Sequence, residues 1–493
     1  MKLKIKILKW SAGIPVAMLN EKTAEELGAR TNDRIVIRSF KKNHEEFFTI
    51  VDIVKDLVKN NEIAVSSELK ERLNLKNRQK VSVDISSMPK SLEFVKKKLN
   101  GGKLSKTEIN SIIQGIINNS LSEPEIALFI SAMYKQGMDM QETIFLIESI
   151  LASGNKLGLK NKFIVDKHSI GGIAGNRTTP IVVSICAVAG LIMPKTSSRA
   201  ITSSAGTADV METIAKVEFS TSELKKIVKK TNACIVWGGG LGMVPADSKI
   251  INIEKMLKID PESQLLASIM SKKLAMGSKY ILIDIPYGKS AKVNKSKALR
   301  LKKKFEFLGR HFKKKLKVVL TDGSQPIGNG IGPVLEMLDI IKILDPSQQG
   351  PKDLEQKSLF LAGELLEMTG KAKKGKGFEL AEEILYSGKA FEKFKQILRE
   401  QKGSIKKIHL AKFKKDILAR KSAKISEIDN KKINLLARIA GCPVNKSAGL
   451  YLHFHVGEKI NRKEKILTIY SESRSRLKQA VKFYKKENLI KFK

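Results

Sequence analysis

The chain has 493 residues, of which 42% are hydrophobic and 29% are charged, and its formal net charge is +41. This length exceeds what one ordinary hydrophobic core serves, and it predicts roughly two to four domains. The composition is typical of a soluble globular protein, and the longest apolar run, residues 181–193, is shorter than the roughly 18 residues that a membrane span needs. We therefore expect no membrane association.

So positive a charge makes a nucleic-acid-binding protein one interpretation, because Lys and Arg neutralise phosphates and release counterions. Lysine, however, greatly outnumbers arginine and is spread along the whole chain, without a basic stripe interleaved with aromatic residues. We expect no dedicated nucleic-acid function and attribute the charge to a lysine-biased composition that attracts anionic substrates. A basic nucleic-acid-binding protein stays the alternative from another functional class.

The cysteines and the N-terminus indicate the compartment. Cys186, Cys234 and Cys442 are far apart, odd in number and not at metal-ligand spacing, which favours free thiols in a reducing environment. The first residues alternate lysine with Leu or Ile and lack the unbroken apolar stretch of a signal peptide. We expect a cytoplasmic protein without a bound metal.

In chain order, residues 1–86 are predicted to form a small β-rich, barrel-like domain. The alternation over residues 2–7 predicts a strand, and a strand, short helix, strand pattern occurs twice, ending near residues 37 and 83. Such a repeat predicts a pseudo-symmetric barrel. No cluster of titratable residues marks a site in this domain.

The rest of the chain is predicted to form a multidomain α/β protein. Residues 87–160 are predicted to form a helical domain, followed by a mainly parallel α/β domain at 161–345 and a C-terminal α+β domain at 346–493. Strand-like runs at 163–165, 280–283 and 318–320 alternate with helical segments. Residues 181–193 are predicted to form a buried helix.

Residues 166–176, Asp-Lys-His-Ser-Ile-Gly-Gly-Ile-Ala-Gly-Asn, read as a strand that ends in a glycine-rich loop. Glycines let backbone amides approach an anion, and Lys167 adds positive potential, so the loop predicts a phosphate site. Thr179 is expected to cap the following helix, with Pro180 at its first position. A tight turn between strand and helix is the alternative.

A second segment, residues 197–212, is rich in hydroxyl side chains and contains Arg199. Hydroxyl and guanidinium groups can donate hydrogen bonds to phosphate oxygens and sugar hydroxyls. The neighbouring small residues permit close approach of a ligand. The alternative is a polar surface loop with incidental helix caps.

Four segments, 167–172, 197–212, 268–273 and 320–326, resemble the motifs of the thymidine and pyrimidine-nucleoside phosphorylases in order and spacing. The resemblance covers about residues 88–480. Within this family, residues 198–203, 259–262 and 285–289, together with the extra N-terminal domain, are similar to the archaeal AMP phosphorylases. The resemblance implies phosphorolysis of AMP by inorganic phosphate to adenine and ribose 1,5-bisphosphate, in nucleotide degradation or salvage, with CMP and UMP as candidate further substrates.

The resemblance also implies a site, a co-substrate and an assembly. Inorganic phosphate is the co-substrate, no cofactor is implied, and a homodimeric core that the N-terminal domain extends into a larger assembly is expected. The positions that match phosphate ligands are Lys167, Ser169, Ser197 and Thr207. The positions that match nucleotide contacts are Gly172, Ser198, Arg199, Ala200, Ile201, Thr202, Ser203, Thr207, Ser268 and Lys292.

Asp260 matches the general acid of the AMP enzymes. Adenine is a poor leaving group as an anion, so a carboxylic acid that protonates a ring nitrogen assists departure. An apolar surrounding supplied by Leu257, Ile259 and residues 265–266 would favour the protonated acid. The alternative is a helix N-cap, since Asp-Pro-Glu-Ser before an apolar run is a common helix start.

Three positions depart from the family pattern. Ile253 stands where the pyrimidine-nucleoside enzymes use Arg, which speaks against a thymidine or pyrimidine-nucleoside phosphorylase, the alternative within the family. Ser204 replaces Thr or Ala, and Lys463 occupies a turn position usually held by Gly. A phosphoribosyltransferase of related fold is disfavoured because its Gly-Thr-Gly-Gly-Asp loop and metal-binding carboxylates are missing.

Two further clusters have structural interpretations. His453 and His455 could share one face of a strand, but no acidic or Cys partner lies at ligand spacing, which favours a structural role. The glycine run at 238–242 lacks a dinucleotide-binding context and is expected to shape a turn near the site.

Overall fold

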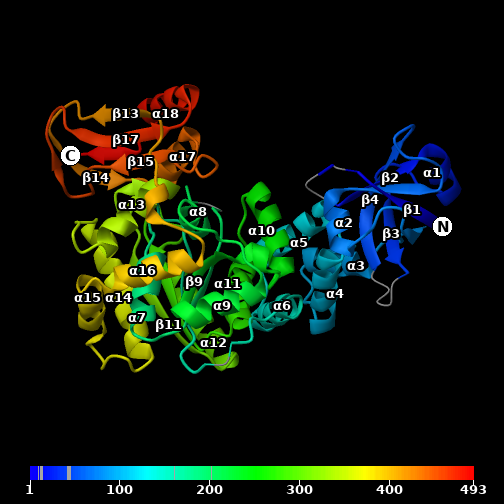
Figure 1. The fold of residues 1–493 in the computed structure, drawn as a ribbon, viewed down its shortest axis with the longest axis horizontal. Helices are drawn as coiled ribbons and strands as arrows, with labels where there is room; N and C mark the ends of the chain where they lie inside the picture. Colours follow the sequence, from blue (N-terminus) through cyan, green and yellow to red (C-terminus); the bar gives the residue numbers. More distant parts are fainter. Residues whose placement is uncertain (9, 12–14, 41–45, 160, 201–202) are drawn as a thin grey trace. The chain divides into compact units, whose positions relative to one another are not determined.

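The computed structural model describes residues 1–493 except 9, 12–14, 41–45, 160 and 201–202 (Figure 1). It divides into two compact units. The first unit comprises Met1–Ser153 and Pro245–Ser268, and the second comprises Gly154–Val244 and Ile269–Lys493. Among the described residues, no helix is long and apolar enough to cross a membrane.

The first unit begins with a closed barrel whose strand order is β1-β5-β2-β4-β3-β6. Its elements are β1 (Lys2–Ile7), β2 (Val16–Asn20), α1 (Glu21–Leu27), β3 (Arg34–Ser39), β4 (Glu46–Val54), β5 (Glu62–Val65), α2 (Ser67–Leu73) and β6 (Lys80–Ile85). The halves β2-α1-β3 and β5-α2-β6 repeat one pattern, and their equivalent strands pair antiparallel. The predicted repeat and barrel are confirmed. In β1, Leu3 and Ile5 face the core while Lys2 and Lys4 are exposed, as the alternation predicted.

Helices form the rest of the first unit: α3 (Lys90–Leu99), α4 (Lys106–Ile117), α5 (Glu123–Gln136), α6 (Met140–Ala152) and α10 (Pro245–Leu257). The N-terminus of α4 is fixed by a capping box, in which the Ser105 amide donates to Glu108 at 2.7 Å and the Ser105 hydroxyl accepts from the Glu108 amide. Helix α10 comes from the middle of the chain and packs on α4 and α5. Lys249 holds it there, because its Nζ donates to the Ile116 carbonyl at 2.7 Å.

The second unit contains two small parallel sheets, β11-β10-β7 and β8-β9. This confirms the predicted parallel arrangement. A parallel bridge between Ile164 and Ile192 lies where β7 and β8 begin. The elements are β7 (Val165–Ser169), α7 (Thr179–Val188), β8 (Met193–Ser197), α8 (Thr207–Met211), α9 (Thr221–Thr231), β9 (Ala233–Trp237), η1 (Gly238–Leu241), α11 (Glu262–Met276, begun in the first unit), β10 (Tyr280–Tyr287), α12 (Lys295–His311) and β11 (Lys315–Asp322).

The core of the second unit surrounds α7, whose residues 179–187 are all buried. A helix that is apolar on every side must be covered on every side. Two of the helices that pack on α7 come from the chain after residue 344: α14 (Lys352–Met368) and α16 (Lys389–Glu400). The helices of this part are α13 (Pro333–Leu344), α14 (Lys352–Met368), α15 (Gly377–Tyr386), α16 (Lys389–Glu400) and η2 (Ile405–Lys407). The four domain ranges drawn from the sequence stay predictions.

The C-terminal part is α+β, as predicted, with sheets β12-β15-β17-β13 and β16-β14-β18. Its elements are β12 (Gly330–Ile331), β13 (Phe413–Leu418), β14 (Ala423–Ile428), α17 (Asn430–Ala440), β15 (Gly449–Leu452), β16 (Lys459–Ile460), β17 (Lys465–Ser471), α18 (Arg474–Lys486) and β18 (Ile490–Phe492). Strand β12 precedes α13 in the chain yet pairs with β15, so this sheet also receives a strand from the α/β segment. Lys463 has a φ of 71°, the left-handed conformation that its turn position predicted.

Candidate active site

The glycine-rich loop leaves β7 at Ser169 and needs glycine at two close approaches. Gly172 has a φ of 92°, and a Cβ there would lie 2.8 Å from Lys292 Cβ. A Cβ at Gly175 would lie 2.2 Å from the Ile327 carbonyl oxygen. The predicted strand and loop are confirmed. The cap prediction was wrong, because Thr178 is the N-cap of α7 and the helix already begins at Thr179, one residue before Pro180.

Lys167 lies inside β7 and is 1% exposed. Its Nζ donates to Thr178 Oγ1 at 2.5 Å, and that hydroxyl makes no capping bond to α7. Burial lowers the pKa of Lys167 to about 7, against the opposing charge of Asp284. The lysine is therefore poised between its charged and neutral forms near neutral pH.

Asp284, on β10, is the buried carboxylate beside this lysine. Thr321 Oγ1 donates to its Oδ1 at 2.6 Å, and Lys357 Nζ lies 3.3 Å from its Oδ2. Burial alone would raise the pKa of Asp284, but the charges of Lys357 and Lys167, together with hydrogen bonds from Thr321 and Ser169, hold this pKa below its usual value. Ser169 also hydrogen-bonds to Asp284 and accepts a bond of 3.4 Å from Asn176 Nδ2. Two predicted phosphate ligands, Lys167 and Ser169, thus share one buried anion.

Ser197, the last residue of β8, carries a hydroxyl that the fold leaves unused. Its Oγ is buried and has no hydrogen-bond partner within the described part of the chain. A buried polar atom without a partner is costly, so native proteins usually reserve such an atom for a ligand or ordered water. This is the behaviour expected of a ligand-binding hydroxyl.

The hydroxyl-rich segment between β8 and α8 is held by one internal bond and by bonds to other parts of the chain. Thr207 Oγ1 accepts from Arg177 Nη1 at 3.0 Å, and Ser203 Oγ donates to the Ala205 carbonyl at 2.7 Å. The Ser204 amide donates to Asn434 at 2.8 Å, whereas Ser198 is exposed. Two of the predicted nucleotide contacts, Ile201 and Thr202, lie outside the described residues.

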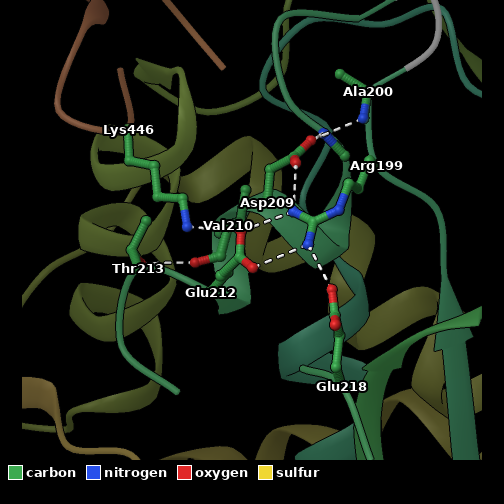
Figure 2. Close-up of polar contacts among 9 residues, drawn as sticks. Arg199, Ala200, Asp209, Val210, Glu212, Thr213, Glu218 and Lys446 are labelled. Atoms are coloured by element: carbon green, nitrogen blue, oxygen red, sulfur yellow. Dashed lines mark hydrogen bonds and ion pairs between the residues drawn. The ribbon is translucent and has the colours of Figure 1, made fainter. Parts of the chain in front are cut away.

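Arg199 is engaged by the loop's own acids (Figure 2). Its Nη1 and Nη2 donate to the two carboxylate oxygens of Glu212 at 2.7 and 2.9 Å, and Nη2 also reaches Glu218 at 3.1 Å. The guanidinium lowers the pKa of Glu212 to about 2, and it lies 4.8 Å from the centre of the Trp237 ring. The side chain therefore shapes the loop, while a nucleotide contact by Arg199 stays a prediction.

The backbone of the same loop is tied to Asp209. Asp209 Oδ2 accepts from the Ala200 amide at 2.7 Å and from the Gly206 amide at 2.8 Å (Figure 2). Lys446, from the C-terminal part, donates to Glu212 at 2.6 Å. The acids of the Thr-x-Asp-x-x-Glu motif thus fix the loop in place, which is a structural reason for their spacing.

Two predicted nucleotide contacts, Gly172 and Lys292, lie in direct contact in the second unit. Two further predicted site residues, Asp260 and Ser268, belong to the first unit. Asp260 is half-buried and lies two residues before α11, and Ser268 is half-buried within that helix. Leu257, which ends α10, is 39% exposed, and the apolar surrounding predicted for Asp260 stays a prediction. Pro261 is buried and its carbonyl starts the α11 hydrogen-bond ladder.

Sequence reasoning missed a second buried charge cluster, whose members lie on β7, β8 and α11. Asp166 Oδ1 accepts from Lys195 at 3.1 Å and from Lys273 at 2.9 Å, and all three side chains are buried. Burial lowers the pKa of Lys273 to about 7, opposed by Asp166, and burial with the neighbouring lysines holds the pKa of His168 well below its usual value. The sequence signal that could have indicated this cluster was a charged residue within a predicted buried segment. Lys195 in β8 is such a residue, and so is Asp284 of the first cluster in β10.

The remaining sequence hypotheses concern cysteines, histidines and glycines outside the loop. Cys186, Cys234 and Cys442 are free and buried, as predicted, and burial raises their thiol pKa values. His453 Nε2 hydrogen-bonds Thr468 and His455 Nε2 hydrogen-bonds Asn329, each at 2.9 Å, so the two rings serve different partners. Residues 238–241 form the short helix η1, which confirms the predicted turn.

Comparison with known proteins identifies the family. Residues 92–154 match the helical bundle domain of the glycosyl transferase family, residues 161–391 match its a/b domain, and residues 424–491 match the pyrimidine nucleoside phosphorylase C-terminal domain. The AMP phosphorylase of Pyrococcus furiosus is 42% identical over 486 residues, which cover 98% of this chain and 96% of the relative. That of Methanococcus vannielii is 40% identical over 483 residues, covering 97% of this chain and 95% of the relative. The chain belongs to the AMP phosphorylase family.

A solved structure outside the AMP phosphorylase family supports the fold. Anthranilate phosphoribosyltransferase from Thermus thermophilus is similar with a TM-score of 0.52 and 16% identity, covering 63% of this chain and 99% of that chain. The likeness concerns the fold alone.

Proposed function

We propose that the protein is an AMP phosphorylase, a pentosyltransferase that cleaves the N-glycosidic bond of AMP with inorganic phosphate and releases adenine and ribose 1,5-bisphosphate. The observation that carries the proposal is 40–42% identity to AMP phosphorylases over nearly the whole chain. The alternative, a pyrimidine-nucleoside phosphorylase, is not favoured, because Ile253 is a buried apolar residue of α10 where that group uses Arg.

In this proposal inorganic phosphate is bound by Lys167, Ser169, Ser197 and Thr207, without a cofactor or metal. The support comes from residues of two parallel strands. Lys167 is buried within β7, which ends at Ser169, and the buried hydroxyl of Ser197, at the end of β8, has no hydrogen-bond partner among the described residues. Phosphate attacks the anomeric carbon through an oxocarbenium-like state. A bound anion positions the nucleophile and stabilises the developing positive charge.

The nucleotide contacts in the proposal are Gly172, residues 198–203, Thr207, Ser268 and Lys292. Asp260 acts as the general acid, and its proton passes to a ring nitrogen of adenine as the C–N bond breaks. General acid catalysis of this kind contributes about 10²–10⁴-fold to the rate.

The test of the function is phosphorolysis by the purified full chain. Inorganic phosphate is supplied with AMP, CMP, UMP, adenosine, uridine or thymidine separately, and released base is followed by chromatography. Release from nucleotides but not from nucleosides would establish the proposal. Release from pyrimidine nucleosides alone would contradict the substrate, and no phosphate-dependent release from any of them would reopen a nucleic-acid-binding role.

Lys292 is expected to bind the 5′-phosphate of the nucleotide. A Lys292→Ala variant should lose AMP turnover about 10- to 100-fold, because a charge-assisted hydrogen bond is lost, and should keep any residual activity on adenosine. Lys295→Ala, at the exposed start of α12, is the matched control and should keep AMP turnover. Equal increases in KM for AMP and in KM for inorganic phosphate would contradict this role for Lys292.

The contact between Gly172 and Lys292 gives a second expectation. Gly172→Ala should raise KM for AMP about tenfold or more, because the new Cβ would push Lys292 from its position. Gly171→Ala controls for backbone strain, since its φ of 84° is similar but no atom of the described residues lies within 4 Å of its Cβ. If Gly171→Ala and Gly172→Ala raised KM for AMP equally, displacement of Lys292 would not be the cause of the increase.

The proposal extends to assembly and location. We propose a homodimeric core enlarged by the N-terminal barrel, and a cytoplasmic role in nucleotide degradation or salvage. The three buried, free thiols support a reducing compartment. Light scattering that gave a mass near the 54.8 kDa of a single chain would contradict the assembly.

A further inference from the structure

Arg177 connects three segments that are far apart in the chain. It follows the glycine-rich loop directly and is 8% exposed. Its Nε donates to Glu336 at 2.6 Å, its Nη2 to the Ala205 carbonyl at 2.7 Å and its Nη1 to Thr207 Oγ1 at 3.0 Å. One guanidinium therefore fixes the glycine-rich loop, the hydroxyl-rich loop and α13 relative to one another.

Glu336 is the anchor of this arrangement. It lies in the first turn of α13, its side chain is fully buried, and its Oε1 accepts from the Gly332 amide at 3.0 Å. Burial raises the pKa of Glu336, and Arg177 opposes this shift. A planar guanidinium held by a fixed carboxylate points its remaining N–H groups in set directions, which a lysine ammonium cannot do.

The bond to Thr207 determines what that hydroxyl can do. A threonine hydroxyl has one proton to donate and two lone pairs that accept. Because Arg177 donates to Thr207 Oγ1, one lone pair is occupied and the hydroxyl proton remains for another acceptor. Anionic oxygens of phosphate accept only, so this orientation suits a substrate anion.

We propose that Arg177 is a positioning residue that holds Thr207 with its hydroxyl proton directed to a substrate anion. The inference rests on the proposed function, which places Thr207 among the anion ligands. Arg177 acts through Thr207 and Ala205, to which it is hydrogen-bonded, rather than by touching the substrate.

The test is a double-mutant cycle between Arg177 and Thr207. Thr207→Val first identifies the kinetic parameter that the hydroxyl controls, either KM for phosphate or KM for AMP. Arg177→Met is expected to raise the same KM about 10- to 100-fold, the loss typical of a hydrogen bond to a charged group. In the Thr207→Val background, Arg177→Met should add less than about threefold, since its target is already absent.

Controls separate positioning from general stability. Arg34 pairs with Glu125 in the first unit at 2.5 Å and is largely buried, so Arg34→Met should lower the melting temperature without raising either KM. Arg177→Lys keeps the charge and should give an intermediate KM. If circular dichroism shows that Arg177→Met does not fold, Arg177→Lys replaces it in the double-mutant cycle with Thr207→Val.

Two outcomes would overturn the inference: additive losses across the cycle, or an increase in a KM different from the one that Thr207→Val raises. If the wild-type chain does not phosphorolyse AMP, the proposed function fails by itself. The cycle is then measured as inorganic phosphate binding by calorimetry, where additive losses or the absence of binding would again overturn the positioning role.

Discussion

Replacing Asp260 by Asn is expected to lower kcat for AMP phosphorolysis about 10²–10⁴-fold, the usual contribution of a general acid. Asparagine keeps the size and polarity of the side chain but has no acidic proton for adenine. Asp260 is half-buried before α11, so the substitution removes no core packing and the melting temperature should change little. Steady-state kinetics at saturating phosphate measure the effect.

A second substrate distinguishes an acid from a structural cap. A ribose 5-phosphate that carries 4-nitrophenolate in place of adenine needs no proton for departure, so Asp260→Asn should cleave it at nearly the wild-type rate. Glu262→Gln, in the first turn of α11, is the matched carboxylate control and should retain turnover of both substrates. Equal losses on the two substrates in the Asp260 variant would assign it a capping role instead.

Anion binding by the free enzyme is expected to weaken as pH rises through about 7, because Lys167 has its pKa lowered to about 7 by burial. Below this pH the lysine is charged and attracts an anion, and above it the neutral form predominates. Each further pH unit should therefore cost about tenfold in affinity, until the pKa of the complex is reached. Sulfate is the suitable probe, because its charge does not change between about pH 5 and 9. The pH dependence of its inhibition constant, measured in competition with phosphate, therefore reports titration of the protein alone.

Variants assign the titration to this lysine. In a plot of sulfate affinity against pH, the wild-type curve should bend near pH 7. Lys167→Gln should bind sulfate weakly, and its curve should lack this bend. Asp284→Asn should move the bend to lower pH, because the Asp284 charge raises the pKa of Lys167. Lys273 also has its pKa lowered to about 7, so a bend that persists in Lys167→Gln would assign the titration to Lys273. Lys98→Gln, at a buried ion pair with Glu142 in the first unit, is a control that should leave the profile unchanged.

Local patterns were sufficient for much of the fold. The alternation of β1 and the repeated strand, helix, strand unit predicted the barrel, because side chains alternate across a strand and a half-buried sheet needs that alternation. The apolar run at 181–193 predicted a buried helix, and α7 is buried throughout residues 179–187. The helix ends at Val188, earlier than predicted, and a turn with Gly190 at a φ of 79° leads to β8, which begins at Met193. The strand and glycine-rich loop predicted at 166–176 are also local, since glycine accommodates the positive φ that Gly171, Gly172 and Gly175 adopt.

The sequence by itself determined the secondary structure, the order of the motifs and the residue types of the candidate site. Only the tertiary structure decided which charges meet: Arg177 pairs with Glu336 across 159 positions, Arg199 binds the acids of its own loop, and Asp284 joins Lys167 and Lys357. It also decided that α10 joins a bundle formed by residues 90–152. The physical reason is that local periodicity follows from backbone geometry within a few residues. A buried ion pair instead needs packing that brings distant partners close enough for their attraction to offset the cost of removing water from both.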